Sequence, residues 1–229
     1  MKNIVIVSGS ANGLGLELSK QLAELNYHIC IIDWNQEGLN KIKNLLNDKC
    51  SVFLGDVSDE NFISNTILEI NSIGNIYALI NNAGEPSFKL PTEYVKKDIE
   101  KCFKGLEGMI LLSSNTLKIK QEKDFKIINI ISSAGLRGNK QESVYCATKW
   151  GERGYTESLK TAYKGTSIKI IGVYPGGINT DFYKNSKDYV SLEKKETFMK
   201  PDDTAKIIIN NAFNDINVTV SDIVIERNA

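Results

Sequence analysis

Histidine is nearly absent from this chain of 229 residues, because His28 is the only one and it opens an apolar run. We therefore expect neither a histidine-based catalytic triad nor a site that holds a metal ion through several histidines. Cysteine is also sparse, and its positions lack the paired spacing of a zinc site or a disulfide framework. The four cysteines are Cys30, Cys50, Cys102 and Cys146.

Long hydrophobic runs and an excess of one charge are missing as well. The longest apolar runs, such as residues 4–7, have the length of a strand, so no transmembrane helix is predicted. No signal-peptide layout precedes that first run, which favours a cytoplasmic protein. Lysine and arginine together number 28, as do aspartate and glutamate, and no basic cluster stands out. We therefore expect no nucleic-acid partner.

Apolar strand-like runs alternate with amphipathic helical stretches along the whole chain. This alternation predicts an α/β fold, in which helices cover both faces of a parallel sheet of about seven strands. We expect one domain over residues 1–229, with the polar, lysine-rich segment 181–200 as a lid on the substrate side. Strands are predicted at residues 3–8, 28–32, 52–54, 76–80, 126–131, 168–174 and 222–225. Two helices are predicted with both bounds, at 36–46 and 92–118. Three more are predicted to begin at residues 14, 59 and 201, and the helix that contains Tyr145 is predicted to end at 163.

A glycine-rich turn follows the first strand and opens the first helix. It reads Gly9-Ser10-Ala11-Asn12-Gly13-Leu14-Gly15. Glycines let a backbone approach a pyrophosphate closely, and the first N–H groups of a helix are free to bind it. The alternative interpretation is a plain tight turn.

Asp33 ends the second predicted strand. A carboxylate at this place can accept hydrogen bonds from an adenosine ribose, and it repels a 2′-phosphate. The alternative is a cap for the helix that follows. Trp34 and Asn12 are uncharged, so no cation is evident beside this ribose position. NAD is therefore favoured over NADP as the cofactor.

Tyr145 and Lys149 lie four residues apart in a helical stretch, so they stack on one face. A nearby cation stabilises a phenolate, and lowering the pKa of a phenol from about 10 to about 7 takes roughly 4 kcal/mol. Such a tyrosine would serve as an acid or a base at neutral pH. By itself the pair is also compatible with an ordinary solvated helix face.

Taken together, the motifs resemble the short-chain dehydrogenase/reductase family from end to end. Beyond the glycine turn and the Tyr145-x-x-x-Lys149 pair, the resemblance is carried by Asp56-Val57, Asn81-Asn82-Ala83-Gly84, Ser132, and the segment from Pro175-Gly176 to Thr180. The serine of this family typically lies thirteen residues before the tyrosine, which selects Ser132 over Ser133. The resemblance implies a Rossmann-like fold.

The resemblance also implies hydride transfer between a nicotinamide cofactor and a small or medium alcohol or ketone. Tyr145 would exchange a proton with the substrate oxygen, and Ser132 would donate a hydrogen bond to that oxygen. Lys149 would lower the pKa of the tyrosine and hold the nicotinamide ribose. The remaining residues implied in cofactor binding are Gly9, Ser10, Asn12, Gly13, Leu14, Gly15, Asp33, Asp56, Val57, Asn82, Ala83, Gly84, Pro175, Gly176, Ile178 and Thr180.

One motif of the family is incomplete. Members commonly carry an asparagine in the pattern Asn-x-x-Gly, and alignment on Gly105 puts Cys102 in its place. The change implies modest turnover that rises when Cys102 becomes asparagine. A cofactor-binding regulatory protein with weak or no turnover is the alternative function. A nucleotide-sugar epimerase or dehydratase is disfavoured by the chain length.

Small residues form a stripe on the Tyr145 helix, away from Tyr145 itself. They permit close approach of another element, either the sheet of the same chain or the helix of a second subunit. We expect a homodimer or homotetramer, as the resemblance also implies. The stripe consists of Ala147, Gly151, Gly154, Ser158 and Ala162.

Overall fold

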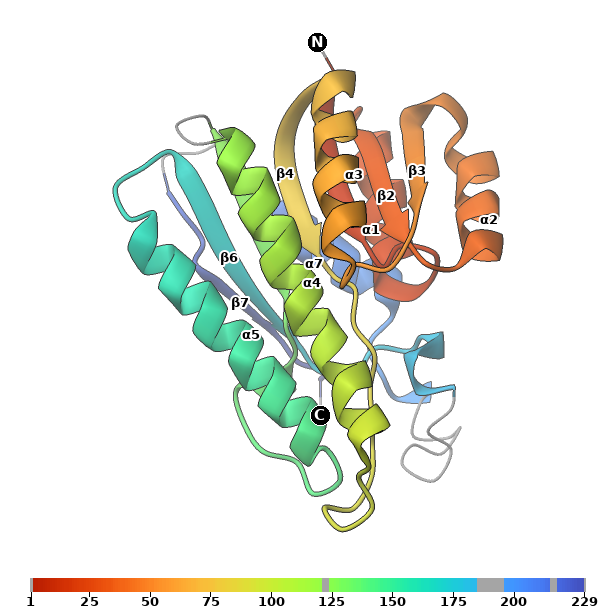
Figure 1. The fold of residues 1–229 in the computed structure, drawn as a ribbon, viewed down its shortest axis with the longest axis vertical. Helices are drawn as coiled ribbons and strands as arrows, with labels where there is room; N and C mark the ends of the chain where they lie inside the picture. The colour runs from red at the N-terminus through yellow and green to blue at the C-terminus, as the bar shows by residue number, and fades with distance from the viewer. Residues whose placement is uncertain (1, 121–123, 185–195, 215–217, 229) are drawn as a thin grey trace.

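A computed structural model describes residues 2–120, 124–184, 196–214 and 218–228. Seven strands form one parallel sheet in the order β3-β2-β1-β4-β5-β6-β7, as Figure 1 shows. The predicted α/β fold and its parallel sheet are thus confirmed. The strands are β1 (Asn3–Ser8), β2 (His28–Asp33), β3 (Cys50–Leu54), β4 (Asn75–Asn81), β5 (Phe125–Ile130), β6 (Ile168–Pro175) and β7 (Asp222–Ile225).

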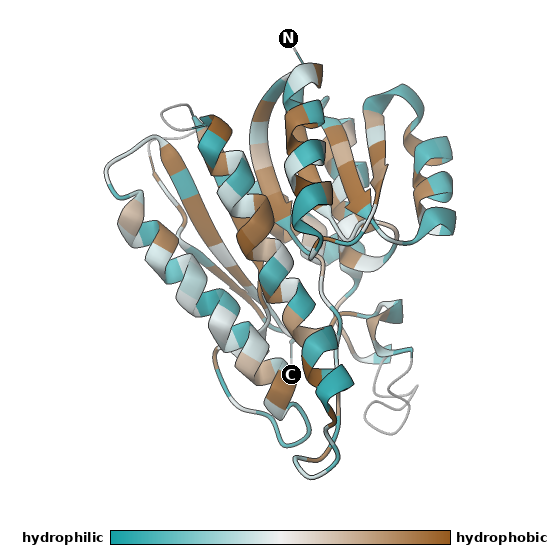
Figure 2. Ribbon diagram, viewed as in Figure 1, coloured by the Kyte–Doolittle hydropathy of each residue, from teal (hydrophilic) through white to brown (hydrophobic). Residues whose placement is uncertain are grey.

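Helices cover both faces of the sheet, which explains why the central strands are apolar at every position (Figures 1 and 2). In β1, Val5 and Val7 pack with α1 and α7, whereas Ile4 and Ile6 pack with α3 and α4 on the opposite face. The helices are α1 (Gly13–Glu24), α2 (Gln36–Leu46), α3 (Glu60–Ile73), α4 (Lys96–Lys120), α5 (Ser143–Ala162) and α7 (Pro201–Ala212).

The chain reverses direction across the sheet next to β1. From β1 it proceeds outward through β2 to β3, and it then returns to place β4 on the other side of β1. The connections after β1 and β4 therefore lead to helices on opposite faces of the sheet and leave a crevice at the carboxyl ends of the strands, where open α/β sheets bind ligands.

The long helix begins later than its sequence pattern predicts. Residues 91–93 form a turn and a bend, residues 94–95 are irregular, and α4 starts only at Lys96. The Asp98 carboxylate accepts a hydrogen bond from the backbone N–H of Val95 at 3.0 Å and pairs with Lys89 at 2.7 Å. These contacts hold the preceding segment as a separate turn, which hydrophobic periodicity alone does not predict.

Only the ends of the predicted lid belong to the described residues. A short 3-10 helix, η3 (Asp181–Tyr183), begins the segment, and residues 196–200 complete it. The backbone of Met199 pairs with Gly177 and Asn179 at 3.0 and 2.9 Å, so both ends lie beside the end of β6. Residues 185–195 lie outside the described part of the chain.

The described residues contain neither a membrane-spanning helix nor a cluster of metal-binding side chains. None of their helices combines the length and the hydrophobicity needed to span a bilayer. The same residues contain no group of three or more histidine, cysteine or acidic side chains arranged to hold a metal ion.

Candidate active site

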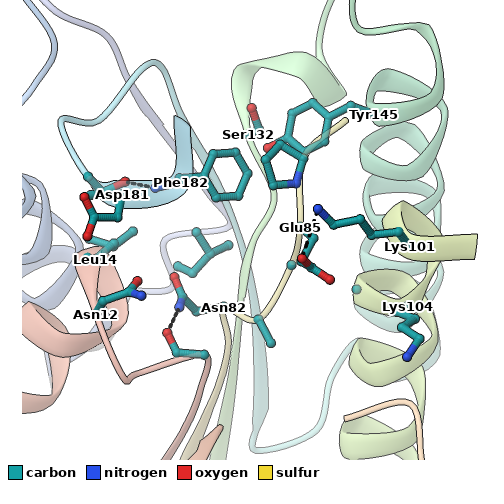
Figure 3. A pocket seen from close by; sticks show the side chains of 18 of the residues that line it. Asn12, Leu14, Asn82, Glu85, Lys101, Lys104, Ser132, Tyr145, Asp181 and Phe182 are labelled. Carbon is teal, nitrogen blue, oxygen red and sulfur yellow. Dashed lines mark hydrogen bonds and ion pairs between the residues drawn. The ribbon is translucent and has the colours of Figure 1, made fainter. Parts of the chain in front are cut away.

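A cavity of about 500 Å³ opens at the carboxyl ends of the strands. Its wall combines loops that are far apart in the sequence, and Figure 3 shows their side chains facing one space. Nearly all of the residues predicted for the site line it. They are Gly9, Asn12, Gly13, Leu14, Asp33, Asp56, Val57, Asn82, Ala83, Gly84, Ser132, Tyr145, Lys149, Pro175, Gly176, Ile178 and Thr180.

Ser10 and Gly15 are the two predicted residues that do not line the cavity. The Ser10 hydroxyl is fully buried and donates a hydrogen bond to the carbonyl of Val7 at 3.1 Å. A Cβ atom at Gly15 would lie 2.3 Å from the carbonyl oxygen of Gly9. Both residues therefore stabilise the turn without lining the cavity. Motif spacing alone cannot distinguish these two roles.

The glycine turn itself is held against the loop after β4. Gly9 has a φ of +68°, and a Cβ atom there would lie 2.7 Å from the Cα atom of Ala83. The Asn82 amide donates to the carbonyl oxygens of Ser8 and Gly9 at 3.1 and 2.8 Å. The two loops of the crevice are thereby locked together (Figure 3).

The start of α1 points at the cavity with its backbone donors free of side-chain caps. Asn12 is the N-cap residue, yet its side chain makes no capping hydrogen bond, and the first turn holds no acidic residue. Free N–H groups and the positive end of the helix dipole suit a phosphate group. The turn therefore fits the pyrophosphate of a dinucleotide.

Asp33 lines the neighbouring part of the cavity with Trp34 and Asn35. One carboxylate oxygen accepts from the N–H of Ala11 at 2.8 Å, and the other accepts from the N–H of Asn35 at 2.9 Å. The capping function considered as an alternative belongs instead to Asn35, whose side chain accepts from Gly38 at 3.0 Å. Asp33 thus links β2 to the glycine turn.

Each lysine in the described cavity wall is paired with a carboxylate. Lys104 contacts Asp56 at 2.6 Å, and Lys101 contacts Glu85 at 3.1 Å, as Figure 3 shows for the second pair. Burial opposes ionisation of Asp56, but the hydrogen bonds from Lys104 and Ser58 hold the pKa of that carboxyl below its ordinary value. The other two pairs are Lys89–Asp98 and Lys149–Glu152.

Ser132 occupies a strained backbone conformation just after β5. Its φ and ψ are 152° and 158°, and this backbone conformation typically costs a residue other than glycine about 1–3 kcal/mol of stability. Its hydroxyl accepts a hydrogen bond from the N–H of Ala134 at 3.1 Å, and its side chain lies beside Tyr145 (Figure 3). Strain of this kind concentrates at functional sites.

Tyr145 stands at the substrate end of the cavity, and Figure 3 shows it beside Ser132 and Phe182. The rings of Phe88 and Phe182 meet it edge to face, at centroid distances of 5.7 and 6.0 Å. Lys149 Nζ lies 5.6 Å from the Tyr145 ring centroid, so the predicted stacking of phenol and cation is present.

The expected lowering of the Tyr145 pKa is not present in this structure. Burial raises the pKa well above its ordinary value, and the negative charge of Glu152 adds to the effect. The hydrogen bond from Ser132 acts in the opposite direction. The sequence-based expectation missed both the aromatic cover over the phenol and the carboxylate paired with Lys149.

Glu152 is the main residue of the site that sequence reasoning overlooked. Its two oxygens lie 2.9 and 2.8 Å from Lys149 Nζ, and its side chain is 1% exposed. The signal was available, because residues three apart on a helix are neighbours. Glu152 follows Lys149 by three positions, so both belong to the Tyr145 face of α5.

The assignment of Cys102 to the asparagine position is not supported by the geometry. Cys102 is buried and lies outside the cavity wall, whereas Gly105 lines it. A Cβ atom at Gly105 would lie 3.3 Å from Gly84 Cα and 3.5 Å from Glu152 Oε1. Because Gly108 follows Gly105 by three residues, alignment of Asn-x-x-Gly on Gly108 places Gly105 at the asparagine.

Comparisons with known proteins agree with this geometry. Residues 3–190 match the family model described as short chain dehydrogenase. The chain is 32% identical over 219 residues to carbonyl reductase family member 4 of Xenopus laevis, covering 91% of this chain and 90% of that protein. It is 28% identical over 210 residues to the 3-oxoacyl-[acyl-carrier-protein] reductase FabG of Rickettsia felis, covering 89% and 86%.

A solved structure shows the same similarity in three dimensions. The structure of ElxO with NADP bound superposes with a TM-score of 0.86 at 27% identity, over 99% of this chain and 98% of that chain. The similarity therefore extends over the whole sheet.

Proposed function

This chain belongs to the short-chain dehydrogenase/reductase family of oxidoreductases, and we propose that it uses Tyr145 as the general acid and base in hydride transfer. The substrate would be a small or medium alcohol or carbonyl compound. The observation that carries the proposal is that Ser132, Tyr145 and Lys149 line the same cavity, with Lys149 Nζ 5.6 Å from the centroid of the Tyr145 ring. A nicotinamide cofactor, when bound, supplies or accepts the hydride.

Two side chains act on the substrate oxygen in this proposal, and a third acts on Tyr145. Tyr145 gives its proton to the oxygen in reduction and takes a proton from it in oxidation. Ser132 donates a hydrogen bond where negative charge develops on that oxygen. Lys149 lies close enough to the phenol to stabilise the phenolate that remains after proton transfer.

The cofactor would extend along the cavity wall from Asp33 to Thr180. Gly9, Gly13 and the start of α1 would face the pyrophosphate, and Asp33 would face the adenosine ribose. The residues that would line the adenosine side are Asp56, Val57, Asn82, Ala83 and Gly84. Those that would line the nicotinamide side are Tyr145, Lys149, Pro175, Gly176, Ile178 and Thr180.

We also propose a preference for NAD(H) over NADP(H). A 2′-phosphate near Asp33 would meet a carboxylate, and each described lysine of the cavity wall already has a carboxylate partner. The opposing consideration is that ElxO, a structural relative, binds NADP. Direct comparison of the two cofactors is therefore the first test.

The substrate end of the cavity favours an apolar carbonyl compound. Phe88, Phe182 and Tyr183 surround the Tyr145 phenol, with Phe88 and Tyr183 stacked at 5.6 Å. Burial of an apolar group against these rings would contribute about 25 cal/mol per Å². The names of two relatives, a carbonyl reductase and a 3-oxoacyl reductase, favour the reductive direction.

The proposal is tested in two steps with the purified protein. Titration with NADH and NADPH, followed by tryptophan fluorescence, gives both dissociation constants, since Trp34 lines the cavity. A panel of aromatic and aliphatic ketones and aldehydes is then screened by cofactor absorbance. We expect tighter binding of NADH and turnover of at least one apolar ketone. Tighter binding of NADPH would refute the cofactor preference, and binding without turnover of any compound would favour the regulatory alternative.

A further inference from the structure

A buried ion pair lies directly beneath the proposed catalytic tyrosine. Lys149 and Glu152 meet through both carboxylate oxygens at 2.9 and 2.8 Å, and their side chains are 8% and 1% exposed. A buried charge remains stable only when its partner is held in good geometry. The pair is therefore an organised part of the site, and the proposed proton transfer does not by itself require Glu152.

The space for this carboxylate is provided by a glycine on the neighbouring helix. Glu152 Oε1 lies 3.5 Å from the position that a Cβ atom of Gly105 would take. Lys149 Nζ lies 3.6 Å from the corresponding position of Gly84. An asparagine at position 105 would extend into the region that the carboxylate of Glu152 now approaches. Gly105 of α4 thus carries no polar side chain, and Glu152 of α5 brings a carboxylate to the same region.

The titratable and charged groups around Tyr145 come from α5 and from other elements. Lys149 and Glu152 lie below the phenol on that helix, and Glu142 precedes it. From other elements, burial and the electrostatic effect of Tyr183 on η3 raise the pKa of the phenol, and the Ser132 hydroxyl after β5 lowers it.

Cys102, from α4, is a further titratable group that interacts with Lys149. Burial raises the pKa of its thiol to about 11, so it is neutral at physiological pH. Glu152 is consequently the buried carboxylate that offsets the lysine charge.

We propose that Glu152 is a positioning residue, which fixes the Lys149 ammonium beneath Tyr145 and offsets its charge so that the phenol stays protonated for carbonyl reduction. This inference rests on the proposed function of Tyr145. In the reductive direction the carbonyl carbon gains a hydride from the reduced nicotinamide, and its oxygen takes the Tyr145 proton. The phenolate then regains a proton from solvent. A protonated phenol is the form required at the start of this sequence.

The sign of the pH effect follows from the charges. Removing the Glu152 charge leaves the Lys149 ammonium unopposed, which stabilises the phenolate and lowers the pKa of Tyr145. The rate of reduction, which requires the protonated phenol, would then begin to fall at a lower pH. The rate of alcohol oxidation, which requires the phenolate, would rise at a lower pH. In Glu152→Gln, we expect the pH at which reduction begins to fall and the pH at which oxidation rises to decrease by about one unit each; these two parts of the pH profile are its limbs.

Ionisation of Tyr145 can be measured without any substrate. In protein labelled with ¹³C at tyrosine Cζ, the Tyr145 signal is assigned by its loss in Tyr145→Phe. It is then followed between about pH 6 and pH 10 in wild type, Glu152→Gln and Glu152→Asp. We expect a neutral phenol throughout in wild type, ionisation at lower pH in Glu152→Gln, and return toward wild type in Glu152→Asp. If Glu152→Gln ionised at the same or a higher pH, the inference would be wrong even for an active enzyme.

The kinetic experiment separates this inference from the proposed function. Glu157→Gln removes an exposed carboxylate one helical turn further along α5, and its pH profile should match that of wild type. If wild type turns over no carbonyl compound, the proposed function fails while the NMR result still decides the role of Glu152. A loss of rate in Glu152→Gln with unshifted limbs would indicate a merely structural residue and overturn the inference.

Discussion

The Asp33 carboxylate accepts a hydrogen bond from the backbone N–H of Ala11 at 2.8 Å and thereby joins the end of β2 to the glycine turn. Its second oxygen accepts from Asn35 at 2.9 Å. Asp33 thus serves as a brace between two loops and as a negative charge at the proposed ribose position. The two roles can be separated by an isosteric substitution.

Asp33→Asn should shift cofactor preference toward NADPH. The amide oxygen can still accept from one backbone N–H, while the charge that opposes a 2′-phosphate is gone. We expect the ratio of the NADPH and NADH dissociation constants to fall about tenfold, which corresponds to about 1.4 kcal/mol. Fluorescence titration of both cofactors measures the ratio.

Asp48→Asn is the control for this change, since it removes an exposed carboxylate outside the cavity wall. Its ratio should equal that of wild type. An unchanged ratio in Asp33→Asn would show that the carboxylate braces the loops without selecting the cofactor.

Cys102→Asn should weaken the fold without improving catalysis. The side chain would place an amide at a buried position outside the cavity wall, where an unsatisfied polar group costs about 1–3 kcal/mol. This replaces the expectation that the substitution raises turnover. Urea denaturation gives the loss of stability, and turnover is measured on the same preparation.

Cys102→Ala provides the comparison, because it removes the thiol without adding a polar group. Its free energy of unfolding should be closer to that of wild type. A faster enzyme after Cys102→Asn would restore Cys102 as the counterpart of the family asparagine.

The outer face of α5 provides a test of assembly. Gly151 of the small-residue stripe packs against Leu106 of the same chain, whereas a Cβ atom at Gly154 would meet no atom within 4 Å. We propose that Gly154 lies in a two-fold interface formed by α4 and α5 of two subunits. Light scattering at micromolar concentration should give a dimer or tetramer, and Gly154→Arg should reduce the measured mass.

Gly138→Arg is the matched control, because Gly138 also faces open space but lies outside both helices. It should leave the mass unchanged. A monomer for wild type would refute the proposed assembly.

Periodicity and motif spacing predicted the strands, their parallel arrangement and most of the cavity wall. They succeeded at β1 and α2 because buried strands are continuously apolar and because Asn35 caps its helix. They failed where a residue acts through a contact distant in sequence. The spacing of three residues already indicated that Glu152 is a neighbour of Lys149, but its place beside Gly105 of α4 required the fold. The contact of Phe182 in η3 with Tyr145 likewise required the fold.

The central claim is that Tyr145 exchanges the proton with the substrate oxygen, and single-turnover reduction by Tyr145→Phe tests it most directly. The experiment uses the ketone that wild type reduces best, with reduced cofactor already bound. Phenylalanine keeps the ring packed against Phe88 and Phe182 but removes the hydroxyl. We predict cofactor binding within about twofold of wild type and a reduction rate at least about a thousandfold lower, within the usual range for general acid catalysis. Reduction by Tyr145→Phe at the wild-type rate would contradict the account.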